Sequence, residues 1–346
     1  MSDHQTPSSS PACLLLYHEH LASNWNKSVN TLKFVNLDDH PDRHAFHHHP
    51  QNDLHLQPAF PEPELCVVGS AKGLVCLNSF SRSDLDSVYI CNPTTREYVK
   101  LPKAHGERVY PNLVAYGFGV TPLTNTFKVV RIYQEQILDD HNPSSYYKSD
   151  LQVYTLGGAG SWRSAGSINC GFGCREFGQS LDGKLHWLVG DANGDELICS
   201  FDLESETIQT FPSAPPTPVV PETDWIRRSI GVLGNCLCLC DNTAHTSLDI
   251  WVMKEYGNGD SWTKEMSIAS EEWMLYEMIH LVKGFKDGEI LFLFWDDILF
   301  SYHPERKSVR RVDVCEAYFS ATVHVPSSIS LESIFGAQQV KHINLS

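Results

Sequence analysis

Residues 89–102 read YICNPTTREYVKLP, and segments of the same design recur at residues 199–212 (CSFDLESETIQTFP) and 300–313 (FSYHPERKSVRRVD). Each segment places an apolar run before a polar turn and then a second, alternating run, which is the pattern of a β-hairpin. Asn and Asp suit the first turn position because their side chains can accept hydrogen bonds from backbone amides two residues further on. That position holds Asn92, Asp202 or His303.

A second type of strand precedes these hairpins, at residues 73–78, 183–188, 235–240 and 288–293. Its third and fifth positions are always large and apolar, whereas the positions between them hold residues as different as Leu, Lys, Cys and Glu. We assign this strand to the inner part of each repeat. Two further hairpins with longer turns, in which Trp162 and Trp262 open the second strand, complete the pattern.

The repeated unit has roughly 50 residues and about four strands, which is typical of a β-propeller. Five units are legible, starting near residues 66, 114, 177, 229 and 281. We expect the early strands and the late strand near residues 321–325 to combine into a sixth blade, because closing the ring removes free sheet edges. A β-sandwich is the main competing architecture, but it would not explain the regular unit.

We therefore predict an all-β fold, a six-bladed propeller closed by its N- and C-terminal strands. A single domain is expected over residues 12–346. Within this division, residues 1–11 are expected to be disordered and residues 38–64, rich in Asp, His, Gln and Pro, to form a long polar loop.

The composition restricts the class of protein. The chain has 346 residues, a formal net charge of −16 and 42% hydrophobic residues, so it can build a core but has no general attraction for nucleic acid or anionic membranes. No secretory signal is visible, and the longest strongly apolar run, residues 290–295, is too short to cross a bilayer. We expect a soluble protein of the cytoplasm, the nucleus or both, in which the eleven cysteines are mostly reduced.

The stretch GNCLCLCD places Cys236, Cys238 and Cys240 on alternate residues of one strand. The first and last lie about 13 Å apart along an extended chain, too far to share one zinc ion. We expect buried thiols packed between blades, no metal and no cofactor. The run His47-His48-His49 can bind transition metals adventitiously, which we favour over a physiological metal site.

Motifs for catalysis are absent from the sequence. There is no Gly-x-Ser-x-Gly elbow and no Walker A loop, so we predict that the protein is not an enzyme and assign no catalytic residues. His186 lies in a Leu-His-Trp strand, where an inter-blade hydrogen bond is the favoured interpretation.

The order of motifs resembles the plant F-box-associated domain, a kelch-like interaction module. That family has a GS-x-x-GL-x-C strand, an NP-x-T hairpin ending in LP, a GFG element leading into KVV, an SWR pair, a GxLHWL strand and an FDL-x-x-E hairpin. This chain carries counterparts within residues 65–265, at 67–77, 89–102, 116–133, 161–163, 181–188 and 198–215. The resemblance implies a propeller that recognises a protein substrate for an SCF-type ubiquitin ligase.

The family pattern normally includes an F-box ahead of the propeller, which binds a Skp-type adaptor and through it a cullin. Residues 1–64 show no F-box, and residues 14–38 instead resemble the stretch that follows one. We therefore expect a protein substrate as the partner, with the adaptor and cullin as partners only if an F-box is present upstream.

The connections that enter the innermost strands of a propeller gather on one face around its channel. Here they include residues 103–112, 213–228 and 270–280. Trp, Tyr and Arg contribute most of the energy of protein interfaces, so the residues of these types are our predicted partner-binding set. They are Arg108, Tyr110, Trp225, Arg227, Arg228, Trp273 and Tyr276. The alternative function is a propeller that binds carbohydrate or another small ligand, with or without enzymatic activity.

Overall fold

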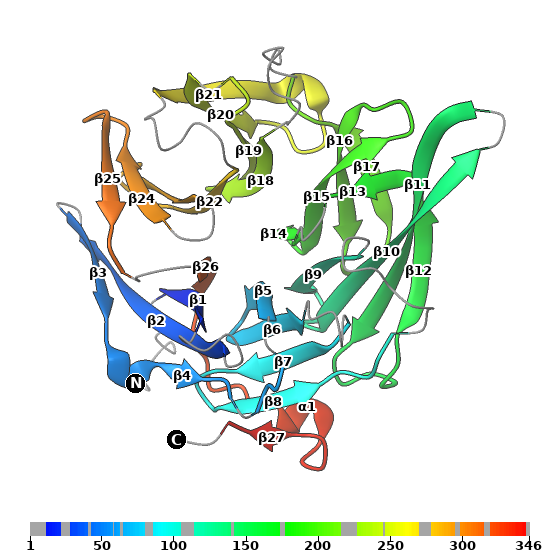
Figure 1. Cartoon of the computed structure of the whole chain (residues 1–346), viewed down its shortest axis with the longest axis vertical. Coiled ribbons are helices and arrows are strands. Elements are labelled where there is room, and N and C mark those ends of the chain that lie inside the picture. The colour runs from blue at the N-terminus through cyan, green and yellow to red at the C-terminus, as the bar shows by residue number, and fades with distance from the viewer. Residues whose placement is uncertain are drawn as a thin grey trace, which may run out of the picture.

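The computed structural model describes residues 12–21, 28–40, 43–57, 59–62, 65–79, 86–104, 114–139, 142–173, 177–215, 227–244, 246–269, 278–294, 298–314 and 319–343. Six antiparallel sheets stand in a ring, which confirms the predicted six-bladed propeller (Figure 1). A helix able to span a membrane, which must be both long and apolar, does not occur within those ranges.

Blade 1 is built from both ends of the chain. From the axis outward it contains β26 (Phe319–His324), β1 (Cys13–Leu21), β2 (Ser28–His40) and then β3 (Arg43–His48) and β4 (Leu54–His55), with the 3-10 helix η1 (Pro50–Asn52) between the last two. Cys13 of β1 pairs with His324 of β26, so the predicted closure of the ring by the two termini is confirmed.

The other five blades follow in chain order around the ring. Blade 2 contains β5 (Leu65–Ala71), β6 (Leu74–Ser79), β7 (Val88–Asn92) and β8 (Glu97–Lys100), and blade 3 contains β9 (Val114–Val120), β10 (Phe127–Asp139), β11 (Asn142–Thr155) and β12 (Arg163–Ile168). Blade 4 contains β13 (Cys170–Phe172), β14 (Gln179–Leu181), β15 (Lys184–Asp191), β16 (Glu196–Asp202) and β17 (Ile208–Pro212). Blade 5 contains β18 (Arg228–Leu233), β19 (Cys236–Asp241), β20 (Ser247–Met253), η3 (Gly259–Ser261) and β21 (Trp262–Ala269), and blade 6 contains β22 (Ile279–Gly284), β23 (Ile290–Phe294), β24 (Ile298–His303) and β25 (Ser308–Val312).

Two expectations from the sequence need correction. Residues 38–64, expected as a loop, supply the end of β2 together with β3, η1 and β4. A strand at the outer rim needs few core contacts, so a polar sequence is tolerated there; Phe46 packs edge-on against Phe285 of blade 6. The repeated strand that we assigned to the inner part of each unit lies second from the axis, as β6, β15, β19 and β23.

The alternation of that second strand has a simple physical origin. Side chains of a strand point to opposite faces in turn, and in a propeller each face of a blade packs on a different neighbour. Val75 and Leu77 of β6 join the core between blades 1 and 2. Leu74 and Cys76 join the core between blades 2 and 3. Both sets of alternating positions in this strand are therefore buried.

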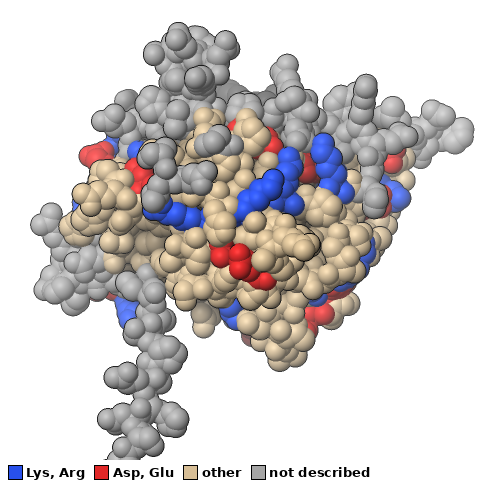
Figure 2. Space-filling view, turned by 90° about the horizontal axis from the view of Figure 1, so that it is seen from below, with Lys and Arg blue, Asp and Glu red and all other residues tan. Residues whose placement is uncertain are grey.

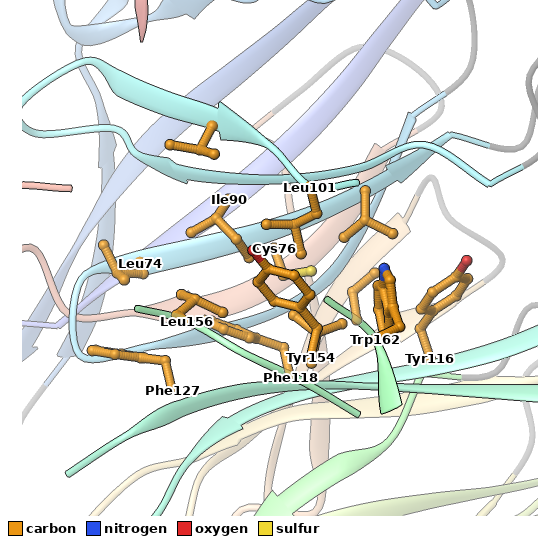
Figure 3. Packing of buried hydrophobic residues seen from close by; sticks show 14 of the residues in the cluster. Leu74, Cys76, Ile90, Leu101, Tyr116, Phe118, Phe127, Tyr154, Leu156 and Trp162 are labelled. Carbon is orange, nitrogen blue, oxygen red and sulfur yellow. The ribbon is translucent and has the colours of Figure 1, made fainter. Parts of the chain in front are cut away.

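The core between blades 2 and 3 shows this packing closely. Figure 3 shows side chains of blade 2 opposite those of blade 3, with an aromatic-rich contact between the two sheets. Among them are Leu74, Cys76, Ile90 and Leu101 on one side and Tyr116, Phe118, Phe127, Tyr154, Leu156 and Trp162 on the other.

The hairpin turns confirm the prediction made from the repeats. Oδ1 of Asn92 accepts a hydrogen bond from the amide of Thr94 at 2.9 Å. Oδ1 of Asp202 accepts one from the amide of Glu204 at the same distance. The fifth position of the repeated turn has a positive φ in all three hairpins, at Arg96, Glu206 and Lys307.

Candidate functional site

The connections between blades lie on one face of the ring. Strand direction alternates within each antiparallel blade, so every passage from an outermost strand to the next innermost strand occurs on the same side. We call this side the loop face. Its long connections include residues 101–113, 213–227 and 270–278. On the opposite side, the turn face, strands are joined by turns as short as Lys72–Gly73 and Asp182–Gly183.

The described ends of all three predicted binding segments lie on the loop face, because each segment joins two blades. Most of the predicted partner-binding residues nevertheless lie outside the described residues, so their side chains are not placed. These are Arg108, Tyr110, Trp225, Trp273 and Tyr276.

Arg228, at the start of β18, is described and its side chain is only 4% exposed. Its Nη1 lies 2.5 Å from Oε1 of Glu196, and its Nε lies 3.1 Å from Oδ2 of Asp241. Nη2 donates to the carbonyl oxygens of Ala214 and Pro215, at 3.2 and 3.1 Å. The guanidinium therefore holds the two ends of segment 213–227 together and is not presented to solvent.

Arg227 differs from its neighbour because it is partly exposed. Its backbone amide donates to Oγ1 of Thr243 at 3.3 Å, and its carbonyl accepts from the amide of Asn242 at 2.9 Å. These two bonds fix the backbone of Arg227 to the β19–β20 connection, at the edge of the loop face. Of the two predicted binding residues that the structure describes, Arg227 is therefore the one with a partly exposed side chain.

Sequence reasoning missed a buried ion pair between blades 2 and 3. Arg131 of β10 is 1% exposed; its Nε donates to Oδ1 of Asp86 at 3.0 Å, and its Nη2 lies 2.8 Å from Oδ2. Nη1 of Arg131 donates to Oε1 of Gln152 at 3.0 Å. The hydroxyl of Tyr116 also donates to the Asp86 carboxylate. The signal in the sequence was one arginine within the apolar run FKVVRIY.

The environment of this ion pair keeps Tyr116 and Arg131 protonated, so both remain hydrogen-bond donors. Burial and the Asp86 carboxylate raise the pKa of Tyr116 well above its usual value, so its hydroxyl keeps its proton and remains a donor. Burial disfavours the charge on Arg131, but Asp86 outweighs this effect and raises the pKa of the guanidinium. Because Asp86 lies near the end of the connection between β6 and β7, the pair anchors one more segment at the loop face.

His186 confirms the inter-blade interpretation made from the sequence. Its Nδ1 lies 3.1 Å from the carbonyl of Gln179, which can only accept, so Nδ1 carries the proton. Its Nε2 then accepts from the hydroxyl of Tyr256 in blade 5, at 2.8 Å. Burial lowers the pKa of His186 to about 4, which keeps the ring neutral.

Two of the three cysteines of GNCLCLCD confirm the prediction of packed thiols, whereas Cys236 is only partly buried. Cys238 and Cys240 are buried between blades 5 and 6, beside Phe292 and Phe300. Burial raises the pKa of Cys240 to about 12, so the thiol stays protonated. Among the described residues, no three His, Cys, Asp or Glu side chains lie together as a metal site would require. Cys174 and Cys315 lie outside those residues.

Lys and Arg side chains gather on one edge of the ring. Figure 2 looks at the edge that lies lowest in Figure 1, where β8 and α1 (Glu332–Phe335) are found, and shows Lys and Arg side chains in a band above a smaller group of Asp and Glu. Exposed lysines on this edge include Lys100 of β8 and Lys341 of β27 (Lys341–His342). An acidic chain can therefore still offer a locally basic surface.

Comparison with solved structures finds proteins of low structural similarity to this chain. The fungal lectin of Aleuria aurantia, described as a six-bladed beta-propeller, is 12% identical and covers 92% of this chain and 97% of its own, with a TM-score of 0.39. A putative TolB from Agrobacterium tumefaciens is 9% identical and covers 91% and 98%, with a TM-score of 0.45.

Sequence comparison finds nearer relatives, among them three proteins of Arabidopsis thaliana. The F-box protein At3g07870 is 29% identical, over 86% of this chain and 75% of the relative. The F-box protein CPR1 is 28% identical, over 76% and 67%. The F-box/kelch-repeat protein At3g23880 is 28% identical, over 58% and 52%. The family profile described as the F-box associated beta propeller domain matches residues 25–332, and the chain therefore belongs to that family.

Proposed function

We propose that this propeller is a non-enzymatic recognition module that captures a protein substrate on its loop face. The observation that supports this most directly is the asymmetry of the ring. Each passage from the outermost strand of one blade to the innermost strand of the next begins and ends on the loop face, and buried ion pairs at Arg131 and Arg228 fix the ends of two loop-face segments. Connecting segments held by a rigid scaffold are the usual place for binding residues.

The proposed contact set follows from the sequence prediction and the burial of Arg228. Arg228 positions its segment through intramolecular bonds, so we assign it no direct contact with the partner. The remaining residues are Arg108, Tyr110, Trp225, Arg227, Trp273 and Tyr276.

The role in ubiquitination rests on the names of the relatives, which are F-box proteins. We propose that the captured protein is delivered to an SCF-type ubiquitin ligase wherever the propeller is joined to an F-box. The Skp-type adaptor and the cullin would then be bound by that F-box, and the propeller would contact the substrate alone.

The test replaces Trp225 and Arg227 together by Ala in the full chain and compares partner capture from plant extract by quantitative mass spectrometry. The matched control is Leu123→Ala, because Leu123 is 84% exposed in the β9–β10 turn on the turn face. We expect the loop-face variant to lose specific proteins that the wild type and the control retain, with unchanged thermal unfolding. Equal capture by all three proteins would contradict the proposal.

The alternative from the sequence, a propeller that binds carbohydrate or another small ligand, remains a prediction. Saturable binding of a sugar to the wild-type chain in calorimetry, abolished by the same double substitution, would favour it over protein recognition.

A further inference from the structure

The chain does not end with the strand that closes the ring. After β26, residues Val325–Ile343, which we call the C-terminal strap, cross the turn face of blade 2. The strap then forms α1 and adds β27 as an extra strand beside β8, where both are seen at the lower edge of Figure 1. This arrangement was not predicted from the sequence.

Asn92 recognises the first part of the strap while it caps its own turn. Its Oδ1 accepts from the amides of Thr94 and Thr95, as the equivalent Asp202 does in blade 4. Its Nδ2 donates to two carbonyl oxygens of the strap, those of Ser327 at 3.0 Å and Ile329 at 2.6 Å. An aspartate could make the first set of bonds but could not donate in the second.

Glu97 recognises the next step of the strap. Its two carboxylate oxygens accept from Oγ of Ser330 at 2.9 Å and from the backbone amide of Leu331 at 2.6 Å. Leu331 is 0% exposed and joins the core between blades 2 and 3. The carboxylate thus aligns the peptide so that its apolar side chain enters the space between the two blades.

The surface is shaped to accept a backbone. A Cβ at Gly73 would lie 2.0 Å from Oγ of Ser327, and one at Gly157 in blade 3 would lie 2.9 Å from the carbonyl oxygen of Ile334. Beyond α1, Lys341 and His342 pair with β8, and the amide of Ile343 donates to the carbonyl of Arg96 at 2.9 Å. Polar recognition, an apolar anchor and an added strand are the elements of a peptide-binding site.

We propose that the turn-face edge of blade 2 is a peptide-binding site, occupied in this structure by the chain's own C-terminal strap. Its ligand offers two carbonyls to Asn92, a Ser-Leu step to Glu97 and a final strand to β8. The occupied site ties blade 1 to blades 2 and 3 and so acts as a second closure of the ring. This site lies on the face opposite the proposed substrate surface and does not depend on it.

The first experiment is Asn92→Asp in the full chain, followed by hydrogen exchange of backbone amides. The substitution keeps the acceptor that caps the turn but replaces the donor with an oxygen that faces two carbonyls. We expect the amides of Leu331 and Ile343 to exchange at least about tenfold faster, because two hydrogen bonds are lost, while the amides of β15 keep their wild-type rates. The matched control is Asp202→Asn at the equivalent turn, which should leave strap exchange unchanged.

The second experiment separates the site from the strap. Leu331→Asp should release the strap and leave Asn92 and Glu97 in place, so a fluorescent synthetic peptide of residues 325–343 should bind this variant saturably in an anisotropy titration. The wild-type chain, whose site is filled, should bind the peptide at least tenfold more weakly, and the double variant with Asn92→Asp should not bind it. Unchanged strap exchange in Asn92→Asp would overturn the proposal. Failure of the peptide to bind the released variant would do so as well.

Discussion

Replacing Arg228 with Met tests whether this arginine is a structural residue or an exposed contact residue. The side chain is 4% exposed and bonds two carboxylates and two carbonyls. Met has a similar length but no charge, so the change removes the guanidinium without leaving a large void. The loss in the free energy of unfolding then depends on the carboxylates and carbonyls that are left without the guanidinium.

The magnitude follows from how deeply each partner is buried. Glu196 is 24% exposed and can regain water, so losing its ion pair costs little. Asp241 is 1% exposed and would remain as a buried charge without its cation, and the carbonyls of Ala214 and Pro215 would lose a charged donor. Breaking a buried pair by removing one partner costs about 3–5 kcal/mol, which is the loss we expect.

The assay is urea unfolding followed by tryptophan fluorescence, with midpoints compared at an unchanged slope. The control is Arg311→Met, because Arg311 pairs with Asp313 at 3.0 Å on the surface, with exposures of 66% and 82%, and should lose less than about 1 kcal/mol. Asp241→Asn added to Arg228→Met should recover part of the loss. If Arg228→Met and Arg311→Met cost the same, the structural role is refuted.

Three further predictions concern the core. Burial lowers the pKa of His324 to about 4 from an unfolded value of about 6.5, so the free energy of unfolding should fall as the pH drops through that window. His324→Asn should reduce this pH dependence in melts at pH 7 and 5, and the remainder should come in part from His186, whose pKa is also lowered to about 4. Gly117→Ala should cost about 1–3 kcal/mol because its new methyl would lie 2.7 Å from two side-chain atoms of blade 4, whereas Gly190→Ala, with nothing within 4 Å, should be tolerated in the same urea assay. Iodoacetamide labelling at pH 8, read by mass spectrometry, should modify the partly exposed Cys236 well before the buried Cys238, and equal rates would contradict this packing.

The repeats made the propeller predictable because they are local. The turns at Asn92 and Asp202 are each closed by hydrogen bonds between residues two or three positions apart. A similar local sequence therefore forms a similar hairpin wherever it occurs in the chain. The alternation in β19 likewise marks two buried faces from sequence alone. The segments of the candidate binding surface were predictable for the same reason, since each one joins two recognisable repeats.

The roles of individual charged residues were not predictable in this way. Arg227 and Arg228 are neighbours of the same type, yet only Arg228 meets Glu196 and Asp241, which other strands bring to it. Arg131 finds Asp86 across a blade interface. The apolar run around Arg131 is a signal that this arginine is buried, but a single sequence carries no signal for its partner, because the partner depends on which strand comes to lie opposite.

By itself, then, the sequence determined the hairpins, their number and the closed ring, since these follow from short-range hydrogen bonding and from alternation of apolar side chains. Only the tertiary structure decided which charges are buried and where the C-terminal strap binds. The strap has no periodic pattern of its own, and its site is made by Asn92 and Glu97, more than two hundred residues earlier in the chain.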